Sequence, residues 1–181
     1  AGRTARFIRT LERSDLVDLI HRHTTTYGVP HRAIQLEITE TGLMKDLQTV
    51  IPSLHALNAF GVEIAIDDFG TGYSSLAYLT TLPISELKID RSFVHDLGVT
   101  PQSSAVITAI IAVARSLGLR VIGEGVENLR QMEVLHRLGC SLMQGFLFSR
   151  AIPPDDLELW LKQTVLPRKA PWIGQADKLE L

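Results

Sequence analysis

The chain has 181 residues, of which 45% are hydrophobic and 21% are charged, a composition typical of one soluble globular domain with a substantial core. Its formal net charge of −2 argues against binding to a nucleic-acid polymer, because a phosphate-binding surface needs an excess of Lys and Arg. The longest apolar run, residues 105–114, is far shorter than the roughly 20 residues that cross a bilayer. We therefore expect a cytoplasmic domain without a membrane segment of its own, either alone or as the cytoplasmic part of a larger membrane protein.

Short β-type runs alternate with longer helical runs from Ile34 onward. Strands are predicted at 34–38, 62–66, 87–89, 121–122 and 142–144, and helices at 43–60, 104–117, 128–138 and 155–162. Repeated β-then-α units imply a parallel sheet with right-handed crossovers, hence an α/β fold that is either doubly wound or a closed barrel. We expect residues 1–165 to form one domain and residues 166–181 to form a loose C-terminal tail.

Ionisable side chains fall at the carboxyl ends of the predicted strands. In chain order they are Glu37 and Glu40, Asp67 and Asp68, Lys88 and Asp90, Glu124 and Glu127, and finally Gln144. In a parallel barrel these strand ends meet on one face, which is where the catalytic residues of barrel enzymes lie. Pairing with the dipoles of the following helices would explain a single acid, but not the same strand end four times. The pattern therefore predicts a group of carboxylates on one face.

Such a group of like charges is tolerated mainly where a cation neutralises it. Oxygen ligands without a set of His or Cys favour Mg²⁺ or Mn²⁺ over Zn²⁺. The adjacent Asp67 and Asp68 at a strand end can point one carboxylate to each side, which lets the pair bridge or serve two neighbouring ions. That arrangement suggests two-metal hydrolysis of a phosphoester. Lys88, inside an apolar strand, must find carboxylates and could orient a water or stabilise phosphoryl charge.

Five motifs follow one another along these strand ends. They are Glu37-Ile38-Thr39-Glu40, Asp67-Asp68-Phe69-Gly70-Thr71-Gly72-Tyr73-Ser74-Ser75, Leu87-Lys88-Ile89-Asp90, Gly123-Glu124-Gly125-Val126-Glu127 and Gln144-Gly145-Phe146. In order and spacing they resemble the EAL domain family of bacterial phosphodiesterases, which linearise cyclic di-GMP. The similarity runs from about residue 14 to about residue 163, and the second motif is highly specific.

The resemblance implies a (β/α)₈ TIM-type barrel, of which this chain covers about strands 4 to 8 and at most part of strand 3. It implies a site for Mg²⁺ or Mn²⁺ whose ligands are Glu37, Asp67, Asp68 and Glu124. The catalytic residues that it implies are Lys88, Glu127 and Gln144. Lys88 and Gln144 would hold the hydrolytic water or the network of the metal site, and Glu127 would support that site. Asp90 would contact the substrate, and Glu40 would brace the loop after Asp68.

The implied activity is hydrolysis of cyclic di-GMP to linear pGpG in bacterial second-messenger signalling. Members of the family commonly form homodimers through the helix after the second motif, here Ser75 to Leu79. An upstream sensory or GGDEF domain is the expected partner within a longer chain.

Two motifs of the family are absent from the sequence. One is Glu-Ala-Leu, with its metal-binding Glu and a substrate-contacting Arg, and the other is a strand ending in Asn-x-Ser; no Glu precedes Glu12 and no Asn precedes Asn58. A smaller departure is Ala151, where the family usually has Pro. Because the remaining motifs are intact, truncation explains these absences better than degeneration.

Two other functions are compatible with these motifs. The first is a degenerate or truncated EAL domain that acts as a non-catalytic cyclic di-GMP receptor or as a protein-interaction module. The second, which the specific second motif disfavours, is a different metal-dependent barrel enzyme acting on a small phosphorylated or enolisable substrate.

Overall fold

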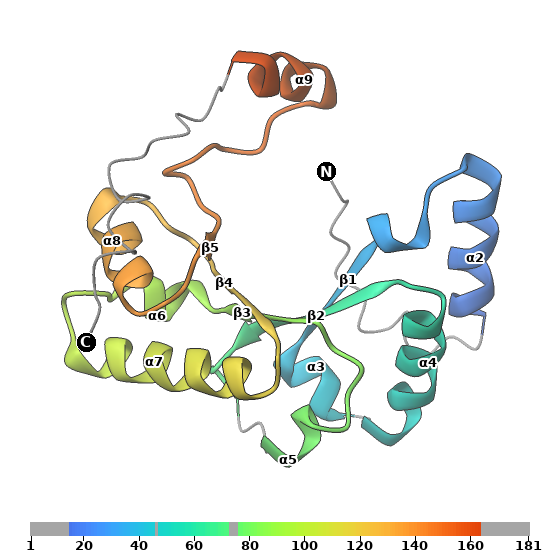
Figure 1. Ribbon diagram of the computed structural model, residues 1–181, viewed down its shortest axis with the longest axis horizontal. Helices are drawn as coiled ribbons and strands as arrows, with labels where there is room; N and C mark the ends of the chain where they lie inside the picture. Colours follow the sequence, from blue (N-terminus) through green and yellow to red (C-terminus); the bar gives the residue numbers. More distant parts are fainter. Residues whose placement is uncertain (1–14, 46, 73–75, 164–181) are drawn as a thin grey trace, which may run out of the picture. The chain divides into compact units, whose positions relative to one another are not determined.

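The computed structural model describes residues 15–45, 47–72 and 76–163 (Figure 1). The strands are β1 (Gln35–Thr39), β2 (Glu63–Phe69), β3 (Glu86–Ile89), β4 (Arg120–Gly123) and β5 (Leu142–Met143). The helices are α2 (Leu16–Tyr27), α3 (Glu40–Lys45), α4 (Leu47–Ala59), α5 (Leu76–Leu79), α6 (Arg91–His95), α7 (Pro101–Ser116), α8 (Leu129–Arg137) and α9 (Pro154–Gln163), with a short 3-10 helix, η1, at His31–Ala33. The chain divides into two compact units, residues 1–148 and 149–181, and α9 belongs to the second. The predicted tail, residues 166–181, lies outside the described residues.

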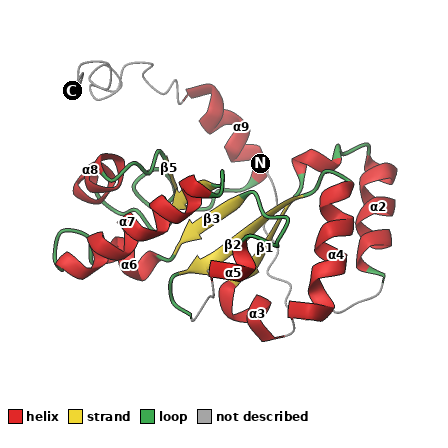
Figure 2. Ribbon diagram, turned by 60° about the horizontal axis from the view of Figure 1, so that its bottom comes forward, coloured by secondary structure: helices red, strands yellow, loops and turns green. Residues whose placement is uncertain are grey.

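The five strands form one parallel sheet in the order β1-β2-β3-β4-β5 (Figure 2). The predicted parallel α/β fold is confirmed. Each strand pairs with the next along the chain, which is the order of a (β/α) barrel, whereas a doubly wound sheet reverses its strand order at a switch point. The strand order therefore decides between the two α/β folds that the sequence pattern left open.

The helices before β2 are the least well predicted part of the described chain. The helical run expected over 43–60 corresponds to α3 and α4, and residue 46 between them lies outside the described residues. The pattern missed α2, whose segment includes three consecutive threonines at 24–26, and β-branched residues have low helix propensity. Tertiary packing stabilises this helix, since α2 contacts α4 and its Leu16 and Thr24 side chains are buried.

None of the helices in the described part of the chain combines the length and the apolar composition that crossing a bilayer would require.

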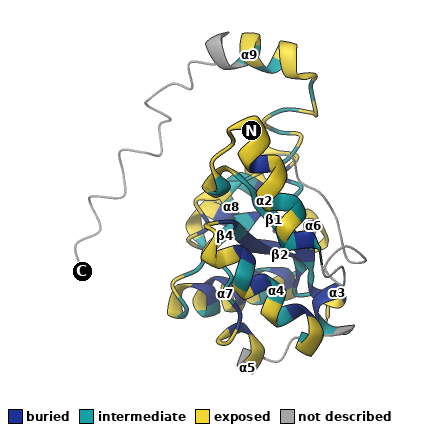
Figure 3. Ribbon diagram, turned by 90° about the vertical axis from the view of Figure 1, so that its right-hand side faces the viewer, coloured by how far each residue is buried: buried dark blue, intermediate teal, exposed yellow. Residues whose placement is uncertain are grey.

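The sheet has one apolar and one polar face, because successive side chains of a strand point to opposite sides. Ile64 and Leu87 on the apolar face are 0% exposed, and this face packs against α4 and α7. Figure 3 shows buried residues along the strands and exposed residues on the outer sides of the helices. The opposite face carries charged side chains at both ends of the strands. The fold thus separates a hydrophobic core from a polar layer that extends along the sheet.

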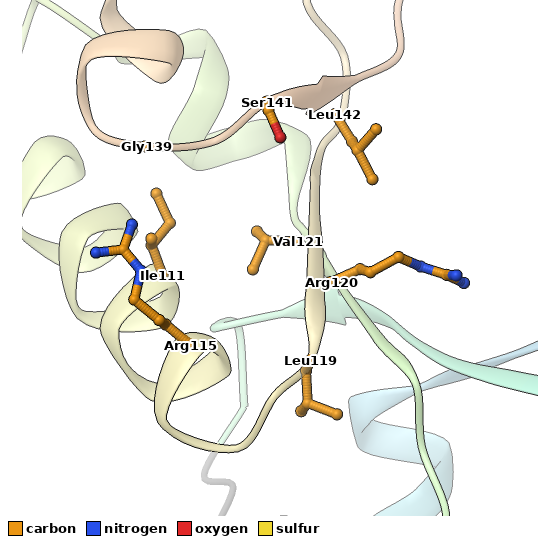
Figure 4. A pocket seen from close by; sticks show the side chains of 8 residues that line it. All are labelled: Ile111, Arg115, Leu119, Arg120, Val121, Gly139, Ser141 and Leu142. Carbon is orange, nitrogen blue, oxygen red and sulfur yellow. The ribbon is translucent and has the colours of Figure 1, made fainter. Parts of the chain in front are cut away.

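A network of hydrogen bonds and an ion pair joins polar side chains on this face at the amino ends of the strands. The Glu86 carboxylate, 3% exposed, accepts hydrogen bonds from Gln35 Nε2 at 2.8 Å and from Arg120 Nε at 3.2 Å. Arg120 also forms an ion pair with Glu63. Figure 4 shows the Arg120 side chain leaving β4 on the side opposite to Val121, which points toward α7. Arg120 therefore links three strands while compensating a buried carboxylate.

Arg120→Ala should lower the free energy of unfolding by about 1–2 kcal/mol, because it leaves the buried Glu86 carboxylate without its cation. The Arg120 side chain is 46% exposed, so solvent screens its charge. The loss of stability is therefore smaller than the loss expected for a fully buried ion pair. Urea denaturation measures the change. Arg22→Ala, on the exposed surface of α2, is the matched control and should change stability by less than about 0.5 kcal/mol. Equal stability of the two variants would show that the network contributes nothing.

Candidate functional site

Lys88 lies at the centre of a group of carboxylates near the carboxyl ends of the strands. Its Nζ is 2.8 Å from Glu37 Oε2, 3.0 Å from Asp67 Oδ1 and 2.5 Å from Glu124 Oε1. Glu37 belongs to β1, Asp67 to β2 and Lys88 to β3, and Glu124 directly follows β4. Lys88 itself is only 4% exposed. One buried ammonium therefore connects four neighbouring strands.

The electrostatics of this group follow from burial and pairing. Burial by itself would lower the pKa of Lys88, but hydrogen bonds with Glu124, Glu37 and Asp67 outweigh it and raise that pKa above its ordinary value. Burial also raises the pKa of Glu124, and the attraction of Lys88 offsets this only in part. Three carboxylates around one ammonium carry a formal excess of two negative charges. Such an excess favours binding of a further cation.

Asp67, Asp68 and Glu124 form a second grouping, in which one oxygen from each lies within 4.8 Å of the others. The sequence allowed Asp67 and Asp68 to point to opposite sides of their strand, but in the structure their carboxylates converge. Asp68 has a φ of 54°, in the left-handed region, and the register of β2 against β3 shifts between Ile66 and Phe69. This irregularity redirects Asp68 toward the side of Asp67. The three carboxylate oxygens could hold a hard divalent cation.

Glu40 holds the loop that follows Asp68. Its Oε2 accepts hydrogen bonds from the backbone N–H of Gly70 at 2.8 Å and of Gly72 at 3.2 Å, and the residue is 1% exposed. A Cβ on Gly72 would lie 2.8 Å from Glu40 Oε1, so a larger residue there would displace the carboxylate. Glu40 thus fixes the backbone next to the strained Asp68. The last part of this motif, residues 73–75, lies outside the described residues.

Gln144 and Glu127 occupy different surroundings. Gln144 Nε2 donates a hydrogen bond to Glu124 Oε1 at 2.5 Å, which places the amide directly on the carboxylate group. The Glu127 side chain is exposed, and its backbone N–H donates to Gln131 Oε1 at the start of α8. Within the described residues Glu127 makes no hydrogen bond or ion pair with the carboxylates around Lys88. The structure therefore brings Gln144, but not Glu127, into this hydrogen-bonded group.

Asp90 follows β3 and caps the helix α6. Its Oδ1 accepts a hydrogen bond from the Ser92 backbone N–H at 2.9 Å. Burial would raise the pKa of Asp90, but hydrogen bonds with the Ser92 hydroxyl and backbone hold it below its ordinary value. Asp90 therefore stays ionised beside the group around Lys88 and adds to the negative charge there.

A cavity of about 430 Å³ opens beside these carboxylates, lined by Asp68, Thr71, Asp90, Arg91 and Glu124. Arg91 was not predicted from the sequence as a site residue. Its position directly after Asp90 could have indicated it, but the prediction was based on carboxylates at the strand ends, and Arg91 is a cation. A second cavity of about 210 Å³ lies at the opposite, amino ends of β4 and β5, and the residues lining it include no carboxylate (Figure 4).

The model of the EAL domain family matches residues 5–151. The chain is 45% identical over 142 residues to the bifunctional diguanylate cyclase/cyclic di-GMP phosphodiesterase MucR of Pseudomonas aeruginosa, a match that covers 78% of this chain and 21% of that protein. It is 44% identical over 152 residues to the cyclic di-GMP phosphodiesterase NbdA of the same organism, covering 84% of this chain and 19% of NbdA. The chain thus spans about a fifth of these curated relatives.

Solved structures of the same family share the fold. The MucR phosphodiesterase in complex with c-di-GMP has a TM-score of 0.82 and 41% identity, over 85% of this chain and 63% of that one. The EAL domain of Mycobacterium smegmatis DcpA has a TM-score of 0.82 and 38% identity, over 89% of this chain and 72% of that one. The parallel sheet described above therefore corresponds to part of a TIM-type barrel. With its family model matched over residues 5–151 and its sheet superposing on such domains, the chain belongs to the EAL domain family.

Proposed function

We propose that this domain is a metal-dependent phosphodiesterase that opens one phosphodiester of cyclic di-GMP and releases linear pGpG in bacterial second-messenger signalling. The observation that carries this proposal is the convergence of Asp67, Asp68 and Glu124, with oxygens within 4.8 Å of one another at the carboxyl ends of the strands. The similarity to proteins named cyclic di-GMP phosphodiesterases supplies the substrate.

The proposed metal ligands are Glu37, Asp67, Asp68 and Glu124. All four offer carboxylate oxygens, which suit Mg²⁺ or Mn²⁺ better than Zn²⁺. A structure of the relative BlrP1 from Klebsiella pneumoniae contains manganese and cyclic di-GMP, at a TM-score of 0.76 and 31% identity over 81% of this chain and 38% of that one. Bound ions of this kind acidify a water molecule and stabilise charge on a phosphoryl group.

Lys88 serves in this proposal as a hydrogen-bond donor and a positive charge, not as a general base. Its raised pKa keeps Nζ protonated at neutral pH, so it has no lone pair with which to accept a proton. From the centre of the carboxylates it can hold the attacking water and fix Glu37, Asp67 and Glu124 in one arrangement. Gln144 orients Glu124 through its amide, and Glu40 keeps the loop after Asp68 in place.

Asp90 and Glu127 have less direct roles in this proposal than Lys88 and Gln144. Asp90 lines the cavity and would contact the substrate there, while Glu127, which is exposed, would support the site from the loop after Glu124. A homodimer through α5, an upstream sensory or GGDEF domain and a cytoplasmic location stay predictions. The much greater length of the relatives supports additional domains in the complete protein.

A non-catalytic receptor of cyclic di-GMP is the second candidate function. The sequence favours it in one respect, because these 181 residues lack the Glu-Ala-Leu and Asn-x-Ser motifs that would contribute two further metal ligands.

The isolated chain of 181 residues should therefore form little or no pGpG compared with complete EAL domains. Ligand number and geometry hold the ions in place, so two absent ligands weaken the site severely. Chromatographic measurement of pGpG with Mg²⁺ or Mn²⁺ tests this, and MucR under the same conditions is the positive control. Rapid turnover by the isolated chain would contradict the expectation.

Binding of a divalent cation should raise the melting temperature of the full-length protein by about 2–5 °C in millimolar Mn²⁺, because the ion binds the folded state. Glu124→Gln and Asp67→Asn should abolish most of this shift. Glu133→Gln removes an exposed carboxylate from α8 and should keep the shift in full. If all three variants respond to Mn²⁺ like the unchanged protein, these carboxylates are not ligands.

Lys88→Ala in the full-length protein should retain the fold and much of the substrate binding while lowering kcat by about 100-fold or more. An interaction specific to the transition state affects kcat more than KM. Steady-state kinetics and thermal melting with Mn²⁺ present measure both properties on the same variant. A normal kcat with a depressed melting temperature would instead assign Lys88 a purely structural role, since the buried carboxylates would have lost their counter-ion.

A further inference from the structure

Arg91 places a positive charge in the cavity beside the carboxylates. It is the first residue of α6, its side chain is exposed, and it lines this cavity together with three acids and Thr71. Lys88, by contrast, is buried beneath the carboxylates and bonded to three of them. Arg91 therefore presents the guanidinium that an incoming ligand can reach.

The backbone around Arg91 is held on both sides. Asp90 caps α6 through the Ser92 backbone N–H, which fixes the turn from β3 into the helix. On the other side, Gly125 has a φ of 68°, and a Cβ at this position would lie 2.7 Å from the Arg91 Cβ. The stem of Arg91 thus packs against the loop that carries Glu124. This contact sets where the guanidinium can reach.

The Arg91 guanidinium is available for a ligand. In the part of the chain that the structure describes, it makes no hydrogen bond or ion pair, whereas Arg120 is bonded to Glu63 and Glu86 and Arg130 donates to the Gly98 carbonyl. A guanidinium offers five N–H donors in a planar fork that matches the oxygens of a phosphate. The charge of Arg91 helps to lower the pKa of the neighbouring Asp90, but among the described residues no hydrogen bond occupies its N–H donors, which suits an anionic ligand.

We propose that Arg91 is a substrate-positioning residue that binds phosphate charge of the cyclic dinucleotide, an inference that rests on the proposed function. A cyclic dinucleotide brings one negative charge on each of its two phosphodiesters into a cavity whose other charged groups, Asp68, Asp90 and Glu124, repel it. Arg91 offsets this repulsion where the ligand enters. The contact forms with the bound substrate and persists in the transition state, so it governs KM and Kd more than kcat.

The test uses the full-length protein and two readouts. Calorimetry in Ca²⁺ measures the Kd for cyclic di-GMP, since a structure of BlrP1 contains calcium together with this ligand, and kinetics in Mn²⁺ measure KM and kcat. Arg91→Ala should raise Kd and KM about 10- to 100-fold and change kcat by less than about 3-fold, with an unchanged melting temperature. Arg91→Lys keeps the charge but not the planar fork of donors, and it should recover part of the affinity. Arg22→Ala, on α2, should leave every value unchanged.

Each other outcome refutes a distinct statement. If Arg91→Ala binds and turns over cyclic di-GMP like the unchanged protein, or loses kcat at constant KM, Arg91 is not a substrate-positioning residue. If Arg91→Lys is as weak as Arg91→Ala, binding through phosphate charge is refuted. If the unchanged protein neither binds nor hydrolyses cyclic di-GMP, the proposed function itself fails, and the Arg91 inference fails with it.

Discussion

The ammonium of Lys88 is the interaction on which the arrangement of the site depends. Glu37, Asp67 and Glu124 lie within 2.5–3.0 Å of its Nζ, and burying such carboxylates together without a cation would be prevented by desolvation and mutual repulsion. Because these acids come from β1, β2 and the end of β4, Lys88 also holds the carboxyl ends of neighbouring strands together. The charge of Lys88 therefore contributes both to the arrangement of the carboxylates and to the packing of the strands.

The polar face of the sheet is charged at both ends, but the two ends differ in balance. At the amino ends, Arg120 compensates Glu63 and Glu86 in a closed network. At the carboxyl ends, Lys88 faces three carboxylates, and other acids lie nearby. The excess of negative charge is thus concentrated at one end of the strands. The proposed cation site and the proposed phosphate-binding role of Arg91 both follow from this asymmetry, since a bound cation and Arg91 each reduce the same excess of negative charge.

Backbone irregularity contributes as much to the site as side-chain identity. A regular strand would send neighbouring residues to opposite faces, yet Asp68 lies in the left-handed region and joins Asp67 on one side. Such a conformation persists only where surrounding contacts hold it. Glu40 supplies them by accepting hydrogen bonds from Gly70 and Gly72 directly after Asp68. A buried acid outside the carboxylate group therefore supports the geometry of that group.

The sequence by itself determined the parallel α/β class and the alignment of acids with strand ends, because period-two alternation and turn residues are local signals. It also determined the family, since the second motif is specific. Only the tertiary structure decided that Asp67 and Asp68 converge, that Arg120 joins three strands and that Arg91 enters the cavity. These features depend on a strained φ, on strand register and on contacts between residues far apart in the chain. A periodic pattern reports which face of its own strand a side chain occupies, but the partners across that face are set by packing.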